Sequence, residues 1–319
     1  MCSRSSKEFG TCSASIATAA SEVALTVGDG VALDAALTLP AGPGPHPALI
    51  PLHPAADRSR HQYLFRHLAT VLPPRGIAVL RYERRGDDVA LEEQAADTRS
   101  AIAKLRARDD LDPTRIGLWG FSQGAWVAPL VASRSADVAF LVLVASTGVS
   151  PSEQMLYGCA KHAREAGFSA GEVDRLVALR RTADEWRRGH LTRELAQAAV
   201  DAAADEPWFE HAYVQRELGD GIWPNMDFDP EAVFAQVRVP VLLFYGEDDE
   251  WQPIDASIAT WQRAARRAGN TDVTVVRLAG TRHSPTIGGR EDAAAIAPEY
   301  ERALVAWLEE RAAVRGGLP

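Results

Sequence analysis

A serine with a glycine two residues away on each side marks the part of the chain best suited to chemistry. It lies in the run Gly120-Phe121-Ser122-Gln123-Gly124, which follows the apolar residues 115–119 and precedes the helix-compatible residues 125–131. The two glycines allow a tight turn between a strand and a helix, so the Ser122 hydroxyl projects from the end of a sheet beside a helix N-terminus. We therefore predict that Ser122 is a nucleophile.

A serine hydroxyl is a weak nucleophile at neutral pH and needs a general base within hydrogen-bonding distance. In a parallel sheet, the loops at the carboxyl ends of the strands meet at one edge. His283 follows residues 273–278, the last strand that the sequence predicts, and is therefore placed to meet Ser122. We predict that His283 is the base, and His53 is the alternative.

An acidic residue that orients the base is expected after residues 239–245, because the chain order serine, acid, histidine is typical of this arrangement. Several acidic residues follow Gly246 in that loop. Asp249 is preferred for its offset from Gly246. Its neighbours Asp248 and Glu250 are the alternatives, and a further possibility is that all of these residues are solvated loop carboxylates without a part in the chemistry.

The elements that must position these residues alternate between strands and helices. Gly28-Asp29-Gly30 supplies the turn of an antiparallel hairpin formed by residues 22–27 and 31–37. An uninterrupted apolar run at residues 138–144 is typical of a parallel strand covered on both faces. Further strands are predicted at residues 48–53, 77–82, 115–119, 239–245 and 273–278, and helices at 63–71, 95–106, 125–131, 255–268 and 293–313. We therefore predict an α/β fold with a mostly parallel central sheet flanked by helices.

The alternation stops between residues 150 and 230, which predicts an inserted helical lid. Within it, Ser169-x-x-Glu172 is typical of a helical capping box. Residues 1–21 are rich in Ser, Ala and Thr, lack the apolar core of a secretory signal, and are expected to form a mobile tail. The predicted domains are this tail, a core of residues 22–149 and 231–319, and the lid at 150–230.

Aromatic side chains are frequent in the predicted lid and suit an apolar substrate cavity, although aromatic residues at helical spacing more often serve packing. Aromatic residues of the core and of the acidic loop join them as candidates. The candidate substrate-binding residues are His53, Tyr82, Tyr157, Trp186, Trp208, Trp223 and Trp251.

Composition narrows the class of protein. The 319 residues are 46% hydrophobic, and no stretch approaches the length of about 18 apolar residues that a membrane helix needs. The net charge of -9 disfavours a nucleic-acid partner. The cysteines Cys2, Cys12 and Cys159 have no metal-binding spacing and suggest no disulfide framework. We expect a cytoplasmic protein that binds neither nucleic acid nor membrane.

The chain resembles the α/β-hydrolase superfamily from the first hairpin to the last helix. The resemblance rests on the run around Ser122, on Gly246-x-x-Asp249-x-x-x-Pro253, on His283 and on Arg81-Tyr82-Glu83-Arg84-Arg85-Gly86. The last of these is similar to an R-Y-D-x-R-G run and is interpreted as a structural corner. The branch it resembles holds dienelactone-hydrolase-like esterases, prolyl-oligopeptidase-like and serine-aminopeptidase-like hydrolases, and acyl thioester hydrolases.

This resemblance implies an oxyanion hole made of two backbone N–H groups. One belongs to Gln123, and the other lies two residues after His53, at Ala55, with Ala56 as the alternative. Where relatives carry His-Gly, this chain carries His53-Pro54, and a proline has no N–H to donate. Some esterases of the branch use a tyrosine hydroxyl, so Tyr82 is an alternative donor unless it is buried.

The predicted reaction is acyl transfer through a covalent acyl-enzyme, in which Ser122 attacks a carbonyl, His283 moves the proton and Asp249 orients the ring. The expected partner is a small-molecule acyl substrate, an ester, lactone, thioester or small amide, and no metal or cofactor is required. One alternative uses the same residues for non-hydrolytic acyl transfer or cyclisation. Another is a ligand-binding protein without catalysis.

Overall fold

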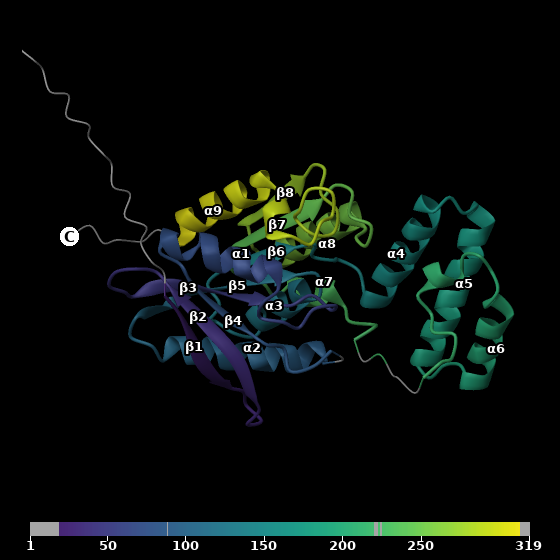
Figure 1. Cartoon of the computed structure of the whole chain (residues 1–319), viewed down its shortest axis with the longest axis horizontal. Helices are drawn as coiled ribbons and strands as arrows, with labels where there is room; N and C mark the ends of the chain where they lie inside the picture. The colour runs from purple at the N-terminus through teal and green to yellow at the C-terminus, as the bar shows by residue number, and fades with distance from the viewer. Residues whose placement is uncertain (1–18, 88, 220–222, 224, 313–319) are drawn as a thin grey trace, which may run out of the picture.

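The computed structural model describes residues 19–87, 89–219, 223 and 225–312, and its centre is an eight-stranded sheet (Figure 1). The strand order is β1-β2-β4-β3-β5-β6-β7-β8. The strands are β1 (Ala19–Thr26), β2 (Ala32–Leu39), β3 (His46–Leu52), β4 (Ala78–Tyr82), β5 (Leu111–Phe121), β6 (Leu141–Val144), β7 (Val241–Gly246) and β8 (Val273–Leu278). The pairs from β3 and β4 through to β8 are parallel, and the pairs of β2 with β1 and with β4 are antiparallel. The predicted α/β fold class is confirmed.

The hairpin at the N-terminal edge forms as the Gly28-Asp29-Gly30 turn predicts. Its first strand begins at Ala19, so residues 19–21, predicted to belong to a mobile tail, pair with β2 instead. Backbone pairing with Leu37 to Leu39 overrides the polar composition of that stretch. The rest of the predicted tail, which includes Cys2 and Cys12, lies outside the described residues.

Helices cover both faces of the sheet. On one face, α1 (Tyr63–Val71) and α9 (Pro298–Ala312) pack with the sheet in one buried apolar cluster. On the other face, a second cluster includes α2 (Leu91–Arg106), α3 (Gly124–Ala132), α7 (Pro230–Phe234) and α8 (Ile254–Ala268). Figure 1 shows the two helical layers on opposite sides of the strands. Apolar side chains on both faces explain the uninterrupted apolar strands β6 and β7.

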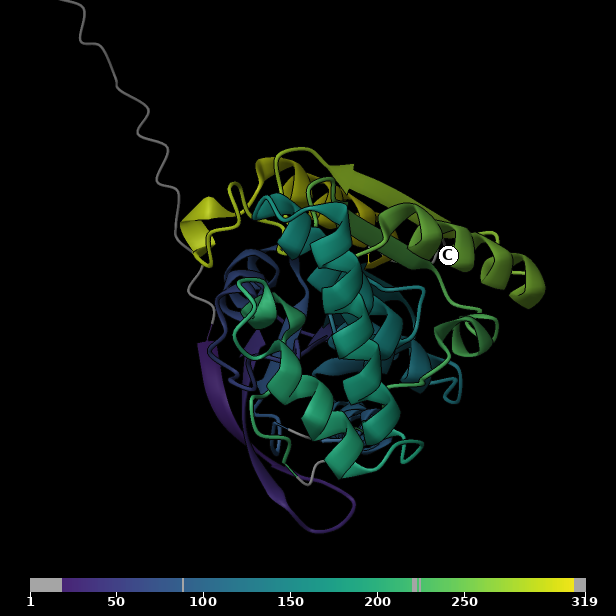
Figure 2. The same cartoon turned by 90° about the vertical axis from the view of Figure 1, so that its right-hand side faces the viewer.

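A group of helices between β6 and β7 stands to one side of the sheet (Figures 1 and 2). It consists of α4 (Pro151–Glu165), α5 (Ala170–Arg187), α6 (Arg193–Ala203) and the short helix η2 (Phe209–Ala212). These helices bury a separate apolar cluster of their own. Ser169 and Glu172 form the predicted capping box at the start of α5, and Ser150 and Glu153 form another at the start of α4. We refer to residues 151–212 as the helical segment.

The last helix, predicted at residues 293–313, forms but begins later than predicted. Ala293–Ala295 form the short 3-10 helix η3, and α9 begins only at Pro298. Another short 3-10 helix, η1 (Pro73–Arg75), follows α1. A proline disfavours helical dihedral angles at the residue before it and is well suited to the first turn of a helix. Pro298 therefore starts a new helix. Among the described residues, no helix is both long and apolar enough to cross a membrane.

Candidate active site

The turn between β5 and α3 places Ser122 in a left-handed conformation, with φ of 53°. A Cβ atom at Gly120 would lie 2.3 Å from the carbonyl oxygen of Gly124, and one at Gly124 would lie 2.3 Å from that of Leu52. Both positions therefore require glycine. The Ser122 N–H donates a hydrogen bond of 3.0 Å to the Val144 carbonyl, which ties the turn to β6. A strained backbone at this position is typical of a nucleophile elbow.

Ser122, His283 and Asp249 lie in hydrogen-bonding contact, although they come from three loops. The His283 Nδ1 atom is 3.0 Å from Asp249 Oδ2 and 3.1 Å from Oδ1, and Nε2 is 2.9 Å from Ser122 Oγ. Because a carboxylate only accepts hydrogen bonds, Nδ1 carries the proton and Nε2 accepts from the serine hydroxyl. The arrangement suits transfer of the hydroxyl proton to His283.

The carboxylate of Asp249 is fully buried and held by its own loop. Its Oδ1 accepts hydrogen bonds from the backbone N–H groups of Trp251 at 2.8 Å and Gln252 at 3.1 Å. The loop lies so close to the one that carries His283 that a Cβ atom at Gly246 would be 1.9 Å from the Arg282 carbonyl oxygen. Of the alternatives for the acid, Asp248 is exposed, and Glu250 pairs with Arg282 at 3.1 Å.

Electrostatics separate His283 from its rival. Burial lowers the pKa of His283, but the charge of Asp249 and its hydrogen bond outweigh this, so the pKa is raised above the ordinary value of 6.5. His53 lies at the end of β3, where burial and the charge of Arg84 lower its pKa to about 3. Its ring packs edge-on against Phe65 and Tyr82, and Nε2 has no hydrogen-bond partner among the described residues. His53 therefore stays neutral and serves packing.

A cavity of about 600 Å³ opens onto Ser122 and His283. Of the residues predicted to bind substrate or an oxyanion, Ala55, Gln123, Trp223 and Trp251 line it, as does the alternative donor Ala56. The backbone N–H groups of Ala55 and Gln123 have no acceptor within the described part of the chain, as an oxyanion hole requires.

The other predicted substrate-binding residues do not line this cavity. Tyr82 is buried, and its hydroxyl bonds Thr98 Oγ1 at 3.1 Å, so it is not an oxyanion donor here. Trp208 is buried in the apolar cluster of the helical segment, Trp186 packs against that cluster, and Tyr157 is half-buried on α4. Trp186 and Trp208, like His53, therefore serve packing.

Arg84 holds the loop of Pro54 and Ala55, which contains one of the predicted oxyanion donors, and the sequence did not reveal this role. Its buried guanidinium donates to the carbonyl oxygens of Pro54 at 2.7 Å and Ala55 at 2.9 Å, and to Gln123 Oε1 at 3.1 Å. The Pro54 carbonyl and the Ala55 N–H belong to one planar peptide and point in opposite directions. Arg84 therefore turns the Ala55 N–H away from itself, while Gln94 Nε2 donates to the same Gln123 oxygen at 3.0 Å.

Helix α4 contacts the loops that carry the acid and the base. Lys161 Nζ donates to the Asp249 carbonyl oxygen at 2.9 Å, and Arg282 Nη2 donates to Glu165 at 2.9 Å. The Trp251 indole lies against Gly158, where a Cβ atom would be 2.3 Å from the ring. No local sequence pattern predicts these contacts, because α4 and the two loops are far apart in the chain.

Comparison with known proteins agrees with this architecture. The chain is 24% identical to esterase EstD of Thermotoga maritima over 253 residues, which are 75% of this chain and 55% of that esterase. It thus spans about half the length of that relative. An esterase of Pyrococcus furiosus shares the fold with a TM-score of 0.59 and 17% identity, over 92% of this chain and 91% of the other.

A dienelactone hydrolase of Anabaena variabilis also shares the fold, with a TM-score of 0.52 and 16% identity over 92% of this chain and 98% of the other. Residues 29–284 match the X-Pro dipeptidyl-peptidase (S15) family. That match contains the whole of the sheet from β2 to β8 and all three loops of the site. The chain therefore belongs to the X-Pro dipeptidyl-peptidase (S15) family and has the α/β-hydrolase fold of the esterase branch that its motifs resemble.

Proposed function

We propose that the protein is a serine hydrolase that cleaves an ester, lactone, thioester or small amide bond through an acyl-enzyme on Ser122. The observation that carries this proposal is the chain of contacts from Ser122 Oγ through His283 to Asp249, with distances of 2.9 and 3.0 Å. A base within 3.2 Å of the hydroxyl, itself oriented by a buried carboxylate, is the arrangement that activates a serine.

In the proposed reaction, Ser122 Oγ attacks the substrate carbonyl while its proton moves to His283 Nε2. The carbonyl oxygen becomes an oxyanion that accepts hydrogen bonds from the N–H groups of Gln123 and Ala55. His283 then protonates the leaving alcohol, thiol or amine, and the acyl group stays on Ser122. Water, deprotonated by His283, releases the acid and restores the serine.

The activities of the similar proteins favour an ester as the substrate. The curated relative and one structural neighbour are esterases, and a third is a dienelactone hydrolase, whereas the family name describes a peptidase. We also propose that the helical segment and its return to the core act as a lid, because Met155 from α4 and Trp223 line the same cavity as Ser122.

A fluorophosphonate probe tests the nucleophile. Wild-type protein should be labelled at Ser122, Ser122→Ala should stay unlabelled, and the matched control Ser100→Ala on α2 should be labelled normally. A folded wild type that resists the probe would contradict the proposal and favour a binding protein without catalysis.

A panel of substrates tests which type of bond the protein cleaves. Aryl esters, a lactone, a thioester and a dipeptidyl-proline anilide should be turned over with esters fastest. Product analysis with and without an added alcohol or amine separates hydrolysis from acyl transfer. Turnover that yields only the transferred or cyclised acyl product would overturn the hydrolytic assignment and leave the nucleophile intact.

A further inference from the structure

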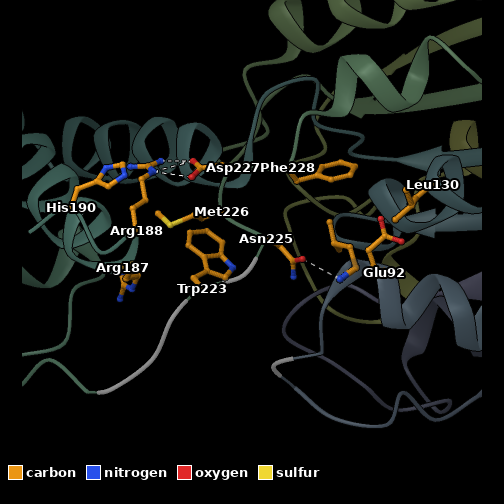
Figure 3. Close-up of a pocket in the computed structure, with 11 residues that line it drawn as sticks. Glu92, Leu130, Arg187, Arg188, His190, Trp223, Asn225, Met226, Asp227 and Phe228 are labelled. Atoms are coloured by element: carbon orange, nitrogen blue, oxygen red, sulfur yellow. Dashed lines mark hydrogen bonds and ion pairs between the residues drawn. The ribbon is translucent and has the colours of Figure 1, made fainter. Parts of the chain in front are cut away.

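A second cleft, of about 500 Å³, adjoins the proposed active site (Figure 3). Its lining comes from the end of α5, from the first turn of α2, and from residues 225–228, which lead from the helical segment back to the core. Nothing in the proposed reaction uses this space. In Figure 3 the Trp223 indole lies between the α5 side, marked by Arg188, and the core side, marked by Glu92.

Trp223 connects the cleft with the catalytic cavity. Among the residues that the structure describes, it alone lines both spaces. Its half-buried indole thus stands where the cavity that opens onto Ser122 meets the cleft. A large, flat side chain in such a position limits how far a bound acyl chain can extend.

The indole has a rigid support. The Arg180 guanidinium lies 5.8 Å from the centre of the Trp223 ring, and Arg180 is itself buried. Arg180 donates to buried Asp184 at 3.0 Å and to the Tyr213 carbonyl oxygen at 3.1 Å. Asp184 in turn accepts from Ser152 Oγ at 2.8 Å. A buried cation that is itself held by Asp184 and the Tyr213 carbonyl stabilises the position of the ring by cation–π attraction.

The neighbouring backbone is held as well. Asn225 Oδ1 accepts from the Leu91 N–H at 3.2 Å, in the first turn of α2. The Met226 carbonyl oxygen accepts from the Ser152 N–H at 3.0 Å, at the start of α4. Residues 225 and 226 are therefore bound to the core on one side and to the helical segment on the other.

The chemistry of the cleft favours an uncharged ligand. Glu92 pairs with Arg134 at 2.6 Å, and Arg188 pairs with Asp227 at 2.6 Å. The remaining arginine of the lining, Arg187, pairs with Asp184 at 3.4 Å, and His190 Nδ1 lies 3.0 Å from Glu185 Oε2. The apolar side chains that face the space are Leu91, Leu130, Met226 and Phe228. A charged group entering the cleft would therefore gain no unpaired counter-charge from the described lining residues.

We propose that Trp223 determines acyl-chain length by closing the catalytic cavity toward the cleft, and that the cleft accepts the distal part of an uncharged, elongated acyl group once the indole is reduced. The inference rests on the proposed serine hydrolase function. It assigns specificity to one residue and leaves the roles of Ser122, His283 and Asp249 untouched.

Alkyl fluorophosphonates of graded length, from ethyl to dodecyl, test the proposal by their rates of labelling Ser122. In Trp223→Ala, the ratio of the dodecyl rate to the ethyl rate should rise by about tenfold or more over wild type, the discrimination expected for methylene groups newly admitted to an apolar pocket. Trp223→Phe should give a smaller rise. A dodecyl probe that ends in a carboxylate should show no such gain.

Trp186→Ala is the matched control, because Trp186 is a tryptophan of the neighbouring helical segment that lines neither space. An unchanged ratio in both Trp223 variants, with Ser122 still labelled, would overturn the inference alone. An equal rise in Trp186→Ala would also overturn it, since general loosening would then explain the effect. If no probe labels wild type, the proposed function fails, and the inference fails with it.

Discussion

The core and the helical segment build the site in different ways. In the core, the position of each reacting group follows from strand ends and from glycines that no other residue can replace, such as Gly120 and Gly246. The helical segment has its own apolar cluster and reaches the site through single polar contacts, such as that of Lys161 with the Asp249 carbonyl. From this difference we infer that the proposed reaction depends on the core, while selectivity and fine positioning depend on the segment and its return to the core.

The largest effect should come from the core. Asp249→Asn keeps the shape of the side chain but favours the wrong tautomer of His283, and kcat should fall by about ten-thousandfold. Steady-state kinetics on an aryl ester measure this, and Asp248→Asn, at the exposed neighbour, is the matched control. A loss below about tenfold would show that another group orients the ring, and the contrast between the regions would weaken.

Asp249→Asn should also change how the activity depends on pH. Catalysis needs neutral His283, whose pKa is raised in the folded protein, so kcat/KM should rise with pH through a midpoint above 6.5. Without the Asp249 charge, burial remains, and the residual activity of Asp249→Asn should have its midpoint at lower pH. An unchanged midpoint would show that Asp249 does not set the pKa.

The stability of the folded protein should also depend on pH through the raised pKa of His283. A histidine whose pKa is raised on folding stabilises the folded state fully below the unfolded pKa, near 6.5, and the contribution disappears as the pH rises through the folded pKa. The difference in Tm between wild type and Asp249→Asn should therefore be larger in acid than above the folded pKa.

Arg84 is the cation through which the core holds the loop of Pro54 and Ala55, which contains the proposed oxyanion donor. Arg84→Lys keeps the charge but loses the fork that binds Pro54 and Ala55 together, so kcat should fall by about ten- to a hundredfold with KM little changed. Arg99→Lys, on the exposed face of α2, is the control. A change in KM alone would assign Arg84 to substrate binding rather than to positioning of the loop.

Lys161 is the corresponding cation of the helical segment. Lys161→Met removes one hydrogen bond to the acidic loop, which is worth about 1 kcal/mol, so kcat should fall about fivefold. Lys104→Met, an exposed lysine of α2, should leave kcat unchanged. An effect as large as that of Arg84→Lys would erase the proposed division between the two regions.

The smallest effect concerns the surface of the segment. Gly171 lies in the first turn of α5 with open space around it, so Gly171→Ala should stabilise the fold by about 0.5 kcal/mol without changing activity. Gly167 has a φ of +90°, and Gly167→Ala should destabilise by about 1 kcal/mol. Thermal unfolding measures both. A stabilising Gly171→Ala together with a destabilising Gly167→Ala would show that backbone conformation governs the stability of this surface. Two changes of the same sign would contradict this.

Sequence patterns predicted the features that depend on neighbouring residues in the chain. The helix at Tyr63–Val71 and the strand at Val273–Leu278 have the predicted bounds, and the glycines around Ser122 indicated the turn. Helical spacing predicted that Trp186 lies on a helix, but not which of its neighbours that helix face would contact. The contacts of Arg84 and Lys161 escaped prediction because each joins segments that are distant in sequence.

The beginning of the helical segment is bonded to the stretch that leads from its end back to the core, since the Ser152 N–H donates to the Met226 carbonyl oxygen at 3.0 Å. The strands that flank it are neighbours in the sheet, with Val144 beside Phe244. An insertion whose two ends touch can be excised, lengthened or exchanged while the scaffold keeps its register. Exchange of this insertion, in evolution or in the laboratory, should therefore change substrate selectivity while the sheet and the proposed catalytic residues stay in place.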